Sequence, residues 1–309
     1  MPLACEVMST QQSEAFGRAS ATRIMREACA AAGLDPTDAE LIRLGENAIF
    51  RVGTPPVIVR IARGPAFRDS AAKEVAVAQW LSHEGIRAAR VWRGPDDQPL
   101  DISGSPVTFW EYLDGRRGSP DDLVSLASIL RDLHSRAVPT LFDLPQEDIL
   151  GRVRPRIEAA PIPDEDRRFL IDLVTELNEA VASLDFPLGV SVTHGDAHVQ
   201  NLMVIGGVPI LIDFERVAVG QPEWDLAMTA TEYATAGWWS APQYELFAAT
   251  YGFDVMTWSG FNVLRRVHEL KMTTWLMQNV QEAVEVRTEY QVRLATMRSG
   301  ETQKPWRPF

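Results

Sequence analysis

Two hydrophobic periodicities divide the chain. Residues 17–33 carry apolar side chains at helical spacing, and Gly33 can end that helix. Extended apolar segments follow: strands are expected at 41–52, 57–62, 91–93 and 107–113, with a turn at 54–56 and one helix at 70–84 that Ser70 could cap. This order predicts a small α+β lobe over residues 1–113, in which 1–36 form an N-terminal extension and helix.

From residue 114 onward, apolar positions recur mostly at helical spacing. Helices are expected at 121–135, 164–184, 242–251, 259–280 and 282–298. One island, residues 190–219, breaks the pattern with short apolar strands that flank polar residues. Since 309 residues are too many for one comfortable core, we predict two lobes. The first has an antiparallel sheet and one main helix, and the larger second lobe, 114–309, is mostly helical.

The composition limits the classes of function. The 30 Lys and Arg residues against 42 Asp and Glu give a net charge of −12, which repels nucleic acid and anionic lipid and attracts cationic substrates or metal ions. No segment approaches the roughly 18 apolar residues that a membrane span needs. Cys5 and Cys29 supply no disulfide framework, so we expect a cytoplasmic protein. Nucleic-acid and membrane partners are not expected, and the sequence leaves monomer and homodimer open.

The polar residues of the island form an ordered pattern. Asp196 and Asn201 lie in a loop between two apolar strands, and Asp213 follows a second strand that the glycines 206–207 fold back as a hairpin. A hairpin this short brings Asn201 and Asp213 together at one end. Because Mg²⁺ prefers carboxylate and amide oxygens, these two residues are predicted metal ligands. Asp196 is the predicted base that accepts the proton of an attacking hydroxyl.

These motifs resemble those of the aminoglycoside phosphotransferase family, a branch of the protein-kinase-like fold that also holds choline, homoserine and sugar kinases. The resemblance covers about residues 40–290 and rests on HGDAHVQN at 194–201, IDFE at 212–215 and GQPEWDLA at 220–227. It implies a bilobal protein-kinase-like fold, ATP or GTP as phosphoryl donor, and Mg²⁺. It also implies that His194 braces the loop and the Asp213 backbone, while His198 contacts the γ-phosphate or the base, or is structural. Asp225 would cap its helix or tie down the loop.

Residues for the nucleotide are expected in the small lobe. A strand–turn–strand segment with Gly45 and Asn47 would cover the phosphates. The next strand places Arg60 where protein kinases carry a lysine, and a guanidinium can hold phosphates bidentately; Arg63 is an alternative cation. The partner acid should lie on the following helix, where Glu74 is the best candidate.

The end of the small lobe resembles a kinase hinge, in which the carbonyl of Glu111 and the amide of Leu113 would bind an adenine edge. Acids and tryptophans of the second lobe could hold an amino or ammonium group of the acceptor through charge and cation–π contact. The candidates are Glu215, Glu223, Trp224, Glu232, Trp238, Trp239, Glu269 and Trp275. A small hydroxylated and possibly cationic substrate is therefore expected: an aminoglycoside or other antibiotic, an amino sugar, or an amino alcohol.

Alternative functions stay open at this point. A kinase of the same fold that phosphorylates a peptide or protein is disfavoured, because no activation segment separates Glu215 from Gln221 and no A-P-E signature is present. A catalytically silent binding protein is disfavoured by the retention of Asp196, Asn201 and Asp213. A hydrolase or acyltransferase lacks both a G-x-S-x-G motif and a reactive-cysteine setting.

Overall fold

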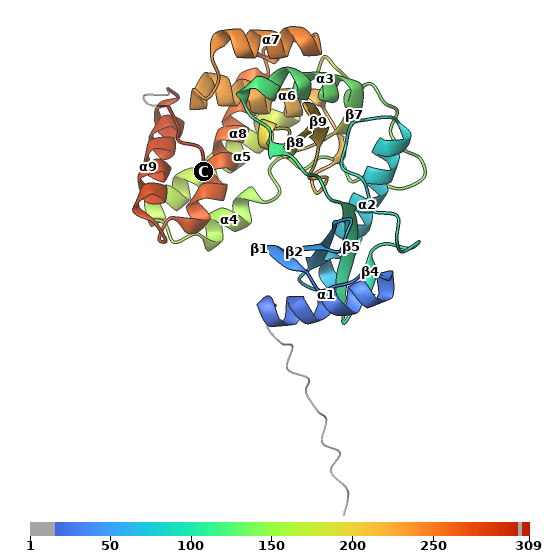
Figure 1. Cartoon of the computed structure of the whole chain (residues 1–309). Helices are drawn as coiled ribbons and strands as arrows, with labels where there is room; N and C mark the ends of the chain where they lie inside the picture. The colour runs from blue at the N-terminus through green and yellow to red at the C-terminus, as the bar shows by residue number, and fades with distance from the viewer. Residues whose placement is uncertain (1–15, 302–304) are drawn as a thin grey trace, which may run out of the picture. The chain divides into compact units, whose positions relative to one another are not determined.

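The computed structural model describes residues 16–301 and 305–309 (Figure 1). The chain forms two compact units, each described here by itself. The first contains the residues up to 75 together with 90–112, and the second contains 76–89 together with 113–309. Helix α2 (Arg68–His83) therefore ends in the second unit, although it precedes the boundary predicted after residue 113.

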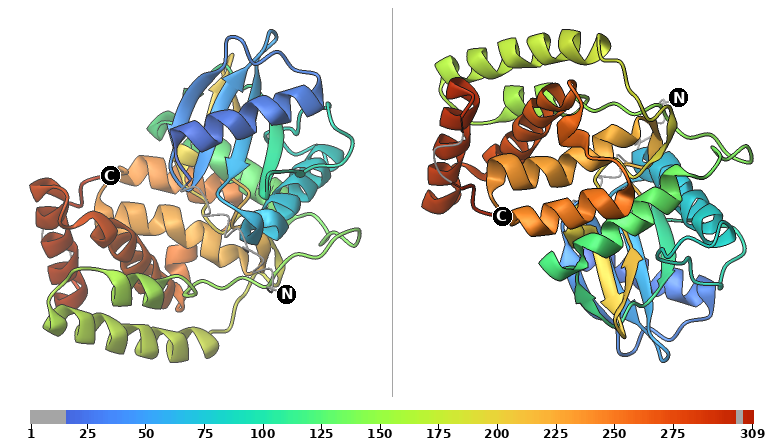
Figure 2. Two further views of the ribbon diagram at one scale, coloured as in Figure 1. Left: turned by 90° about the horizontal axis from the view of Figure 1, so that it is seen from below. Right: turned by 90° about the horizontal axis from the view of Figure 1, so that it is seen from above.

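The first unit is built on a five-stranded antiparallel sheet in the order β1-β2-β3-β5-β4. Its strands are β1 (Glu40–Leu44), β2 (Asn47–Val52), β3 (Val57–Ala62), β4 (Leu100–Ile102) and β5 (Ser105–Glu111). Helix α1 (Arg18–Ala32) runs along one face of this sheet (Figures 1 and 2), where its Ile24 joins Phe50 and Phe109 in one hydrophobic core. Cys29 is a free, buried thiol in the same core, whereas Cys5 lies outside the described residues.

Three local predictions for this unit are wrong. Residues 41–52 are not the single strand that periodicity predicts; they form the hairpin β1–β2, which agrees with the strand–turn–strand segment predicted around Gly45. Residues 91–93 make only an isolated bridge to Trp110, so they extend the sheet by no full strand. Ser70 lies inside α2 and does not cap it. The predicted antiparallel sheet with its main helix is nevertheless confirmed.

Short strands of the second unit position the polar island. They are β6 (Arg116–Arg117), β7 (Ser191–Thr193), β8 (Leu202–Ile205), β9 (Val208–Leu211) and β10 (Ala218–Gly220). β6, β8 and β9 form one sheet, and β7 pairs with β10. The predicted hairpin is confirmed: Leu202 pairs with Leu211, and Gly206 and Gly207 turn the chain with φ of 56° and 84°. Such positive φ values favour glycine.

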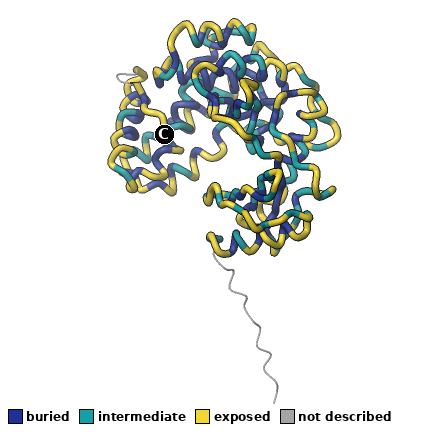
Figure 3. The backbone as a smooth tube through the Cα atoms, in the orientation of Figure 1, coloured by how far each residue is buried: buried dark blue, intermediate teal, exposed yellow. Residues whose placement is uncertain are grey.

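The rest of the second unit is helical. Its helices are α3 (Leu123–His134), α4 (Val153–Ala159), α5 (Asp164–Ala182), α6 (Pro222–Thr231), α7 (Ala241–Tyr251), α8 (Phe261–Leu276) and α9 (Val284–Ser299). α8 packs against α4, α5, α6 and α9, while α3 packs against α7 (Figure 1). α6 is buried along its whole length, and Figure 3 shows the buried residues concentrated in the interior. Among the described residues, no helix has both the length and the apolar character required to cross a membrane.

Helix α4 was not predicted from the sequence. It has only 7 residues and contains Pro155. A proline in the first turn costs no hydrogen bond, since the amides of that turn have no partner within the helix. The sequence signal of such a short helix is therefore weak, although α4 packs on both α5 and α8.

Candidate active site

A buried carboxylate fixes the loop after β7 by hydrogen bonds to its backbone. Asp225 of α6 accepts hydrogen bonds from the backbone amides of His194 (2.6 Å) and Gly195 (2.8 Å). His134 Nε2 donates to the same carboxylate at 3.0 Å. Burial alone would raise the pKa of Asp225, but His134 and the loop donors bring the pKa below its ordinary value. Asp225 thus ties down the loop, and the next residue, Asp196, is left partly exposed.

Glycine is required at position 195. Its φ of 77° is left-handed, and a Cβ atom there would lie 2.5 Å from the carbonyl oxygen of Arg216. The chain that follows Asp213 therefore packs directly against the loop of residues 194–201, the predicted catalytic loop.

Asn201 joins the predicted base to the predicted metal segment. Its Nδ2 donates to the carbonyl of Asp196 (2.9 Å) and lies 3.4 Å from the Asp196 carboxylate. The amide of Ile212 donates to the carbonyl of Asn201 (3.0 Å), and His194 Nε2 donates to the carbonyl of Ile212 (3.0 Å). The structure thereby gathers Asp196, Asn201 and the backbone of Asp213 around one loop, with His194 bracing them.

The oxygen atoms of this group fit a hard divalent cation. Asp213 is exposed and adopts a left-handed φ of 68°, and no side chain in the described part of the chain donates a hydrogen bond to its carboxylate. The Nδ2 atom of Asn201 points to Asp196, which leaves Oδ1 for a ligand. No group of three or more His, Cys, Asp or Glu among the described residues could hold a metal by itself. A Mg²⁺ ion here would complete its shell with phosphate and water, as this ion commonly does.

Asp196 is a carboxylate beside an imidazole. Its side chain is 41% exposed, and its Oδ2 lies 3.6 Å from His198 Nε2. Partial burial would raise the pKa of Asp196, but the His198 interaction, with smaller effects from His194 and Lys271, holds the pKa well below its usual range. Although burial alone would lower the pKa of His198, the facing acids raise it. Asp196 is therefore ionised at neutral pH and can accept a hydrogen bond from a hydroxyl.

Glu232 is a buried acid near this pair. It begins the π-helical turn Glu232–Ala236, and Trp239 Nε1 donates to it at 3.0 Å. Burial raises the pKa of Glu232 to about 7, against the opposing charge of His198 and the hydrogen bond from Trp239. Of the acids predicted to hold an amino group, Glu232 is the one that interacts electrostatically with both Asp196 and His198.

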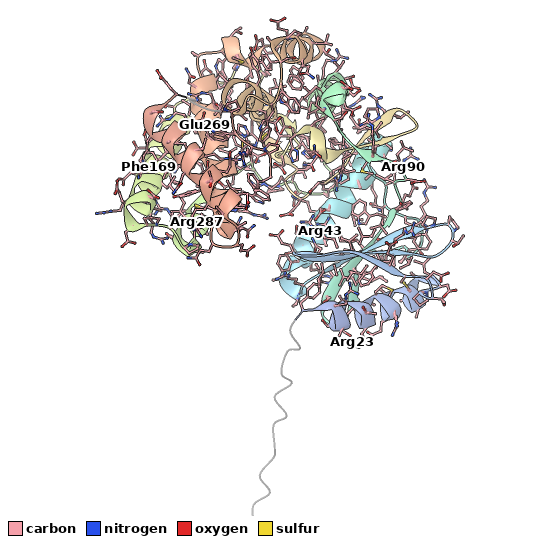
Figure 4. All side chains as sticks on the ribbon, turned by 60° about the vertical axis from the view of Figure 1, so that its left-hand side comes forward. Arg23, Arg43, Arg90, Phe169, Glu269 and Arg287 are labelled. Carbon is pink, nitrogen blue, oxygen red and sulfur yellow. The ribbon has the colours of Figure 1, made fainter. Side chains whose placement is uncertain are left out.

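Four of the other predicted acceptor residues already have partners within the fold. Glu215 forms an ion pair with Arg152, and Glu223 accepts a hydrogen bond from the Leu188 amide (2.7 Å). Glu269, labelled in Figure 4, forms an ion pair with Arg265 and accepts a hydrogen bond from Thr235 (2.6 Å). Trp238 donates to the Trp306 carbonyl (2.6 Å). Trp275 is exposed on α8. Their part in acceptor binding stays a prediction.

The first unit contains the residues predicted for the nucleotide phosphates. Arg60 of β3 forms an ion pair with Glu74 of α2 at 2.5 Å, so the pair expected from the sequence forms. With its amide turned to satisfy the guanidinium, Asn47 accepts from Arg60 Nε (3.2 Å) and Nη2 (3.0 Å). Arg63, the alternative cation, instead holds the carbonyl of Gly45 in the β1–β2 turn (2.6 and 2.8 Å). Phosphate binding by these residues stays a prediction.

The predicted adenine-binding residues lie at the end of β5. This strand ends at Glu111, whose amide donates to the Arg90 carbonyl (2.9 Å). Leu113 lies just beyond the strand, and it is the residue at which the chain enters the segment 113–309 of the second unit. The bonding to an adenine edge is therefore still a prediction.

Lys271 is a residue of this site that the sequence did not single out. Its Nζ lies 4.3 Å from the ring centroid of Trp224, and Trp224 Nε1 donates to the Gly195 carbonyl at 3.3 Å. The ring of His268 also stacks on Trp224, with centroids 3.7 Å apart. The available signal was that Lys271, one of only 3 lysines, lies on a helix that also carries one buried acid, Glu269.

Glu232→Gln should flatten the pH dependence of stability. In the folded protein the pKa is about 7, against an ordinary value of 4.5, so between these values the unfolded state releases a proton that the folded state keeps. The free energy of unfolding therefore falls as pH rises through this window. Between pH 5 and pH 8, the free energy of unfolding of the parent should fall by about 2–3 kcal/mol more than that of the variant, as measured by denaturant unfolding. Equal pH dependence in both proteins would show that Glu232 titrates normally.

Comparison with protein families identifies the chain's relatives. The sequence profile described as "Phosphotransferase enzyme family" matches residues 39–267, which is well over half of the chain and includes the whole polar island. No curated protein sequence matches the chain significantly.

Solved structures share the fold at low sequence identity. An amicoumacin kinase, hAmiN, has a TM-score of 0.72 at 15% identity, with 94% of this chain and 98% of that chain covered. The spectinomycin phosphotransferase APH(9)-Ia has a TM-score of 0.65 at 15% identity, with 87% and 93% covered. The choline kinase LicA from Streptococcus pneumoniae has a TM-score of 0.66 at 15% identity, with 90% and 98% covered. The predicted kinase-like fold is thereby confirmed.

Proposed function

Because the chain belongs to the phosphotransferase enzyme family, we propose that it transfers the γ-phosphoryl group of ATP or GTP, with Mg²⁺, to a hydroxyl of a small amino-containing or polyhydroxylated molecule. Family membership confirms the predicted enzyme class of phosphotransferase. The observation that carries the proposal is Asn201, which is hydrogen-bonded to Asp196 on one side and to the segment of Asp213 on the other.

Each of these side chains would have a separate role in phosphoryl transfer. Asp196, ionised and partly exposed, would accept a hydrogen bond from the acceptor hydroxyl, orient its oxygen, and take its proton as the new phosphate ester forms. Asn201 Oδ1 and the Asp213 carboxylate would hold the metal. A bound Mg²⁺ supplies charge neutralisation for the phosphate oxygens. Arg60, oriented by Glu74, would hold the phosphates nearer the nucleoside.

The names of the structural neighbours support the donor and the class of acceptor. The amicoumacin kinase is described in complex with AMP-PNP and Ca²⁺, and the spectinomycin phosphotransferase with ADP and spectinomycin. A third neighbour is an aminopropanol kinase. Nucleotides thus recur among these neighbours, one of them also contains a divalent cation, and their names refer to small molecules.

The strand after the metal segment favours a small acceptor over a protein. Protein kinases use a long activation segment at this point. Here the residues between Glu215 and Gln221 include β10, which pairs at once with β7. The segment between Glu215 and Gln221 is therefore too short to bind a peptide as an activation segment does.

An ADP-release assay tests the proposal. The purified protein is given ATP or GTP with a panel of amino sugars, aminoglycosides, amino alcohols and short serine peptides, with Mg²⁺ or with excess EDTA. We expect Mg²⁺-dependent ADP or GDP formation that at least one small acceptor stimulates, with a phosphate ester detected by mass spectrometry. Stimulation by the peptides alone would replace the small-molecule proposal with a peptide kinase.

A further inference from the structure

Basic side chains from three segments lie near the loop that carries Asp196 or near Lys271. Lys271 of α8 lies over Trp224, which itself contacts the catalytic loop. The backbone and Cβ of Arg216 pack on Gly195 of that loop, and its guanidinium donates to the carbonyl of Asp148 at 3.3 Å. Arg156 comes from α4, which packs on α8, and its charge acts on Lys271. The site is thus more basic than the net charge of the chain suggests.

The ammonium group of Lys271 is not neutralised by a direct ion pair. Within the described residues, no carboxylate oxygen lies within 4 Å of its Nζ. Asp196 and Glu147 act on the Lys271 charge only at longer range. Glu147 accepts a hydrogen bond from Thr193 Oγ1 at 2.8 Å. Burial, together with Arg216, lowers the pKa of Lys271 to about 8. A partly desolvated cation without a close counter-ion gains strongly from an anionic ligand.

The acids of the same unit do not form an opposing pocket for a cation. Glu269 is neutralised by Arg265, and Glu215 pairs with Arg152. Burial raises the pKa of Glu232 to about 7, so this acid carries only part of a charge near neutral pH. The acids named here are therefore paired or partly protonated, and Asp213, another acid that acts on His198, is a predicted metal ligand.

We propose that Lys271, assisted by Arg216, binds an anionic group of the acceptor, a carboxylate or a phosphate, while the acceptor hydroxyl lies at Asp196. This inference rests on the proposed function and narrows its substrate class to hydroxylated acids, including zwitterionic amino acids. Because Lys271 Nζ lies 4.3 Å from the ring centroid of Trp224, and Trp224 Nε1 donates to the carbonyl of Gly195, the residue before Asp196, the acceptor's hydroxyl and anionic group would be separated by a short chain. A polycationic aminoglycoside would meet repulsion at this point.

The γ-phosphate of the nucleotide is the other anion that could reach Lys271, and kinetics separates the two sources. If Lys271 binds the acceptor, Lys271→Met raises the acceptor KM about tenfold or more, as expected for a lost charge-assisted hydrogen bond, and leaves the ATP KM within about twofold. Lys271→Arg should restore most of the acceptor affinity. A rise confined to the ATP KM would assign Lys271 to the nucleotide and overturn the proposal.

Matched acceptors test the charge directly. The full-length protein is given MgATP and equimolar mixtures of glycerate with glycerol, serine with serinol, and gluconate with glucose, and the phosphorylated products are quantified by mass spectrometry. We expect the acidic member of at least one pair to dominate, and Lys271→Met to abolish that preference. Products from only neutral or cationic members, or no phosphorylated acid at all, would overturn the inference.

A control variant and a binding measurement keep the two proposals separate. Arg266→Met removes a cation from the same helix, where Arg266 pairs with Glu176 on the surface, and should leave acceptor preference unchanged. Mg²⁺-dependent nucleotide binding, measured by calorimetry without acceptor, reports only on the phosphotransferase site. If that binding is intact while acidic acceptors are rejected, the inference fails alone; if it is absent, the proposed function fails.

Discussion

Asp196→Asn should lower kcat by roughly 10²–10⁴-fold, the usual contribution of a positioned general base. The amide keeps the size of the side chain, and the main hydrogen bond from Asn201 goes to the backbone carbonyl of residue 196, so the loop should keep its shape. What is lost is the negative charge that orients the acceptor hydroxyl and accepts its proton. Single-turnover kinetics of phosphate transfer, with acceptor saturating, measures this loss.

The binding of MgATP separates a catalytic from a structural cause. Since Asp196 is not a predicted metal ligand, the variant should bind MgATP within about threefold of the parent affinity. Asp172→Asn, an exposed aspartate on α5, serves as the matched control and should keep full activity. Unchanged turnover in Asp196→Asn would remove this residue as the base.

Asp213→Asn should abolish most of the advantage that Mg²⁺ gives to nucleotide binding. The metal's interaction with the phosphates is worth several kcal/mol, so we expect calorimetry to show a loss of about 100-fold or more in Mg²⁺-dependent affinity. Asparagine is preferred to alanine here because Asp213 has a φ of 68°, a conformation that Asn tolerates and Ala does not. A stability defect is therefore not expected to obscure the result.

The behaviour of the same variant without metal supplies the control. Nucleotide binding in excess EDTA should be equal in parent and variant, because the contacts of Arg60 and the rest of the first unit are unchanged. A variant that responds to Mg²⁺ as strongly as the parent would show that the metal binds elsewhere.

The parts of this structure that the sequence predicted are those with local signals. Apolar periodicity located α1, α3, α5, α7, α8 and α9, since each buries one continuous face. The glycines at 206–207 located the β8–β9 hairpin, and the hairpin in turn placed Asn201 beside the Asp213 segment. Periodicity could not divide residues 41–52, because both strands of a hairpin continue the same alternation and only Gly45 marks the turn.

Features of the site that depend on distant contacts could not be predicted in this way. The left-handed backbone of Asp213 occurs next to Ile212, whose backbone is hydrogen-bonded to Asn201 and His194. Lys271 lies over Trp224, whose Nε1 donates to the carbonyl of Gly195, because α8 packs on α6. Glu269 was predicted to bind the amino group of an acceptor, but it forms an ion pair with Arg265, which lies one helical turn earlier on α8.

A crystal structure with Mn²⁺ and AMP-PNP would test the metal-binding claim most directly, because Mn²⁺ shares the oxygen preference of Mg²⁺ and scatters anomalously. We predict an anomalous peak at about 2.1 Å from both Asn201 Oδ1 and an Asp213 carboxylate oxygen, in contact with nucleotide phosphate oxygens and next to Asp196. A bound nucleotide whose metal lies away from Asn201 and Asp213, or that carries no metal at all, would contradict the assignment.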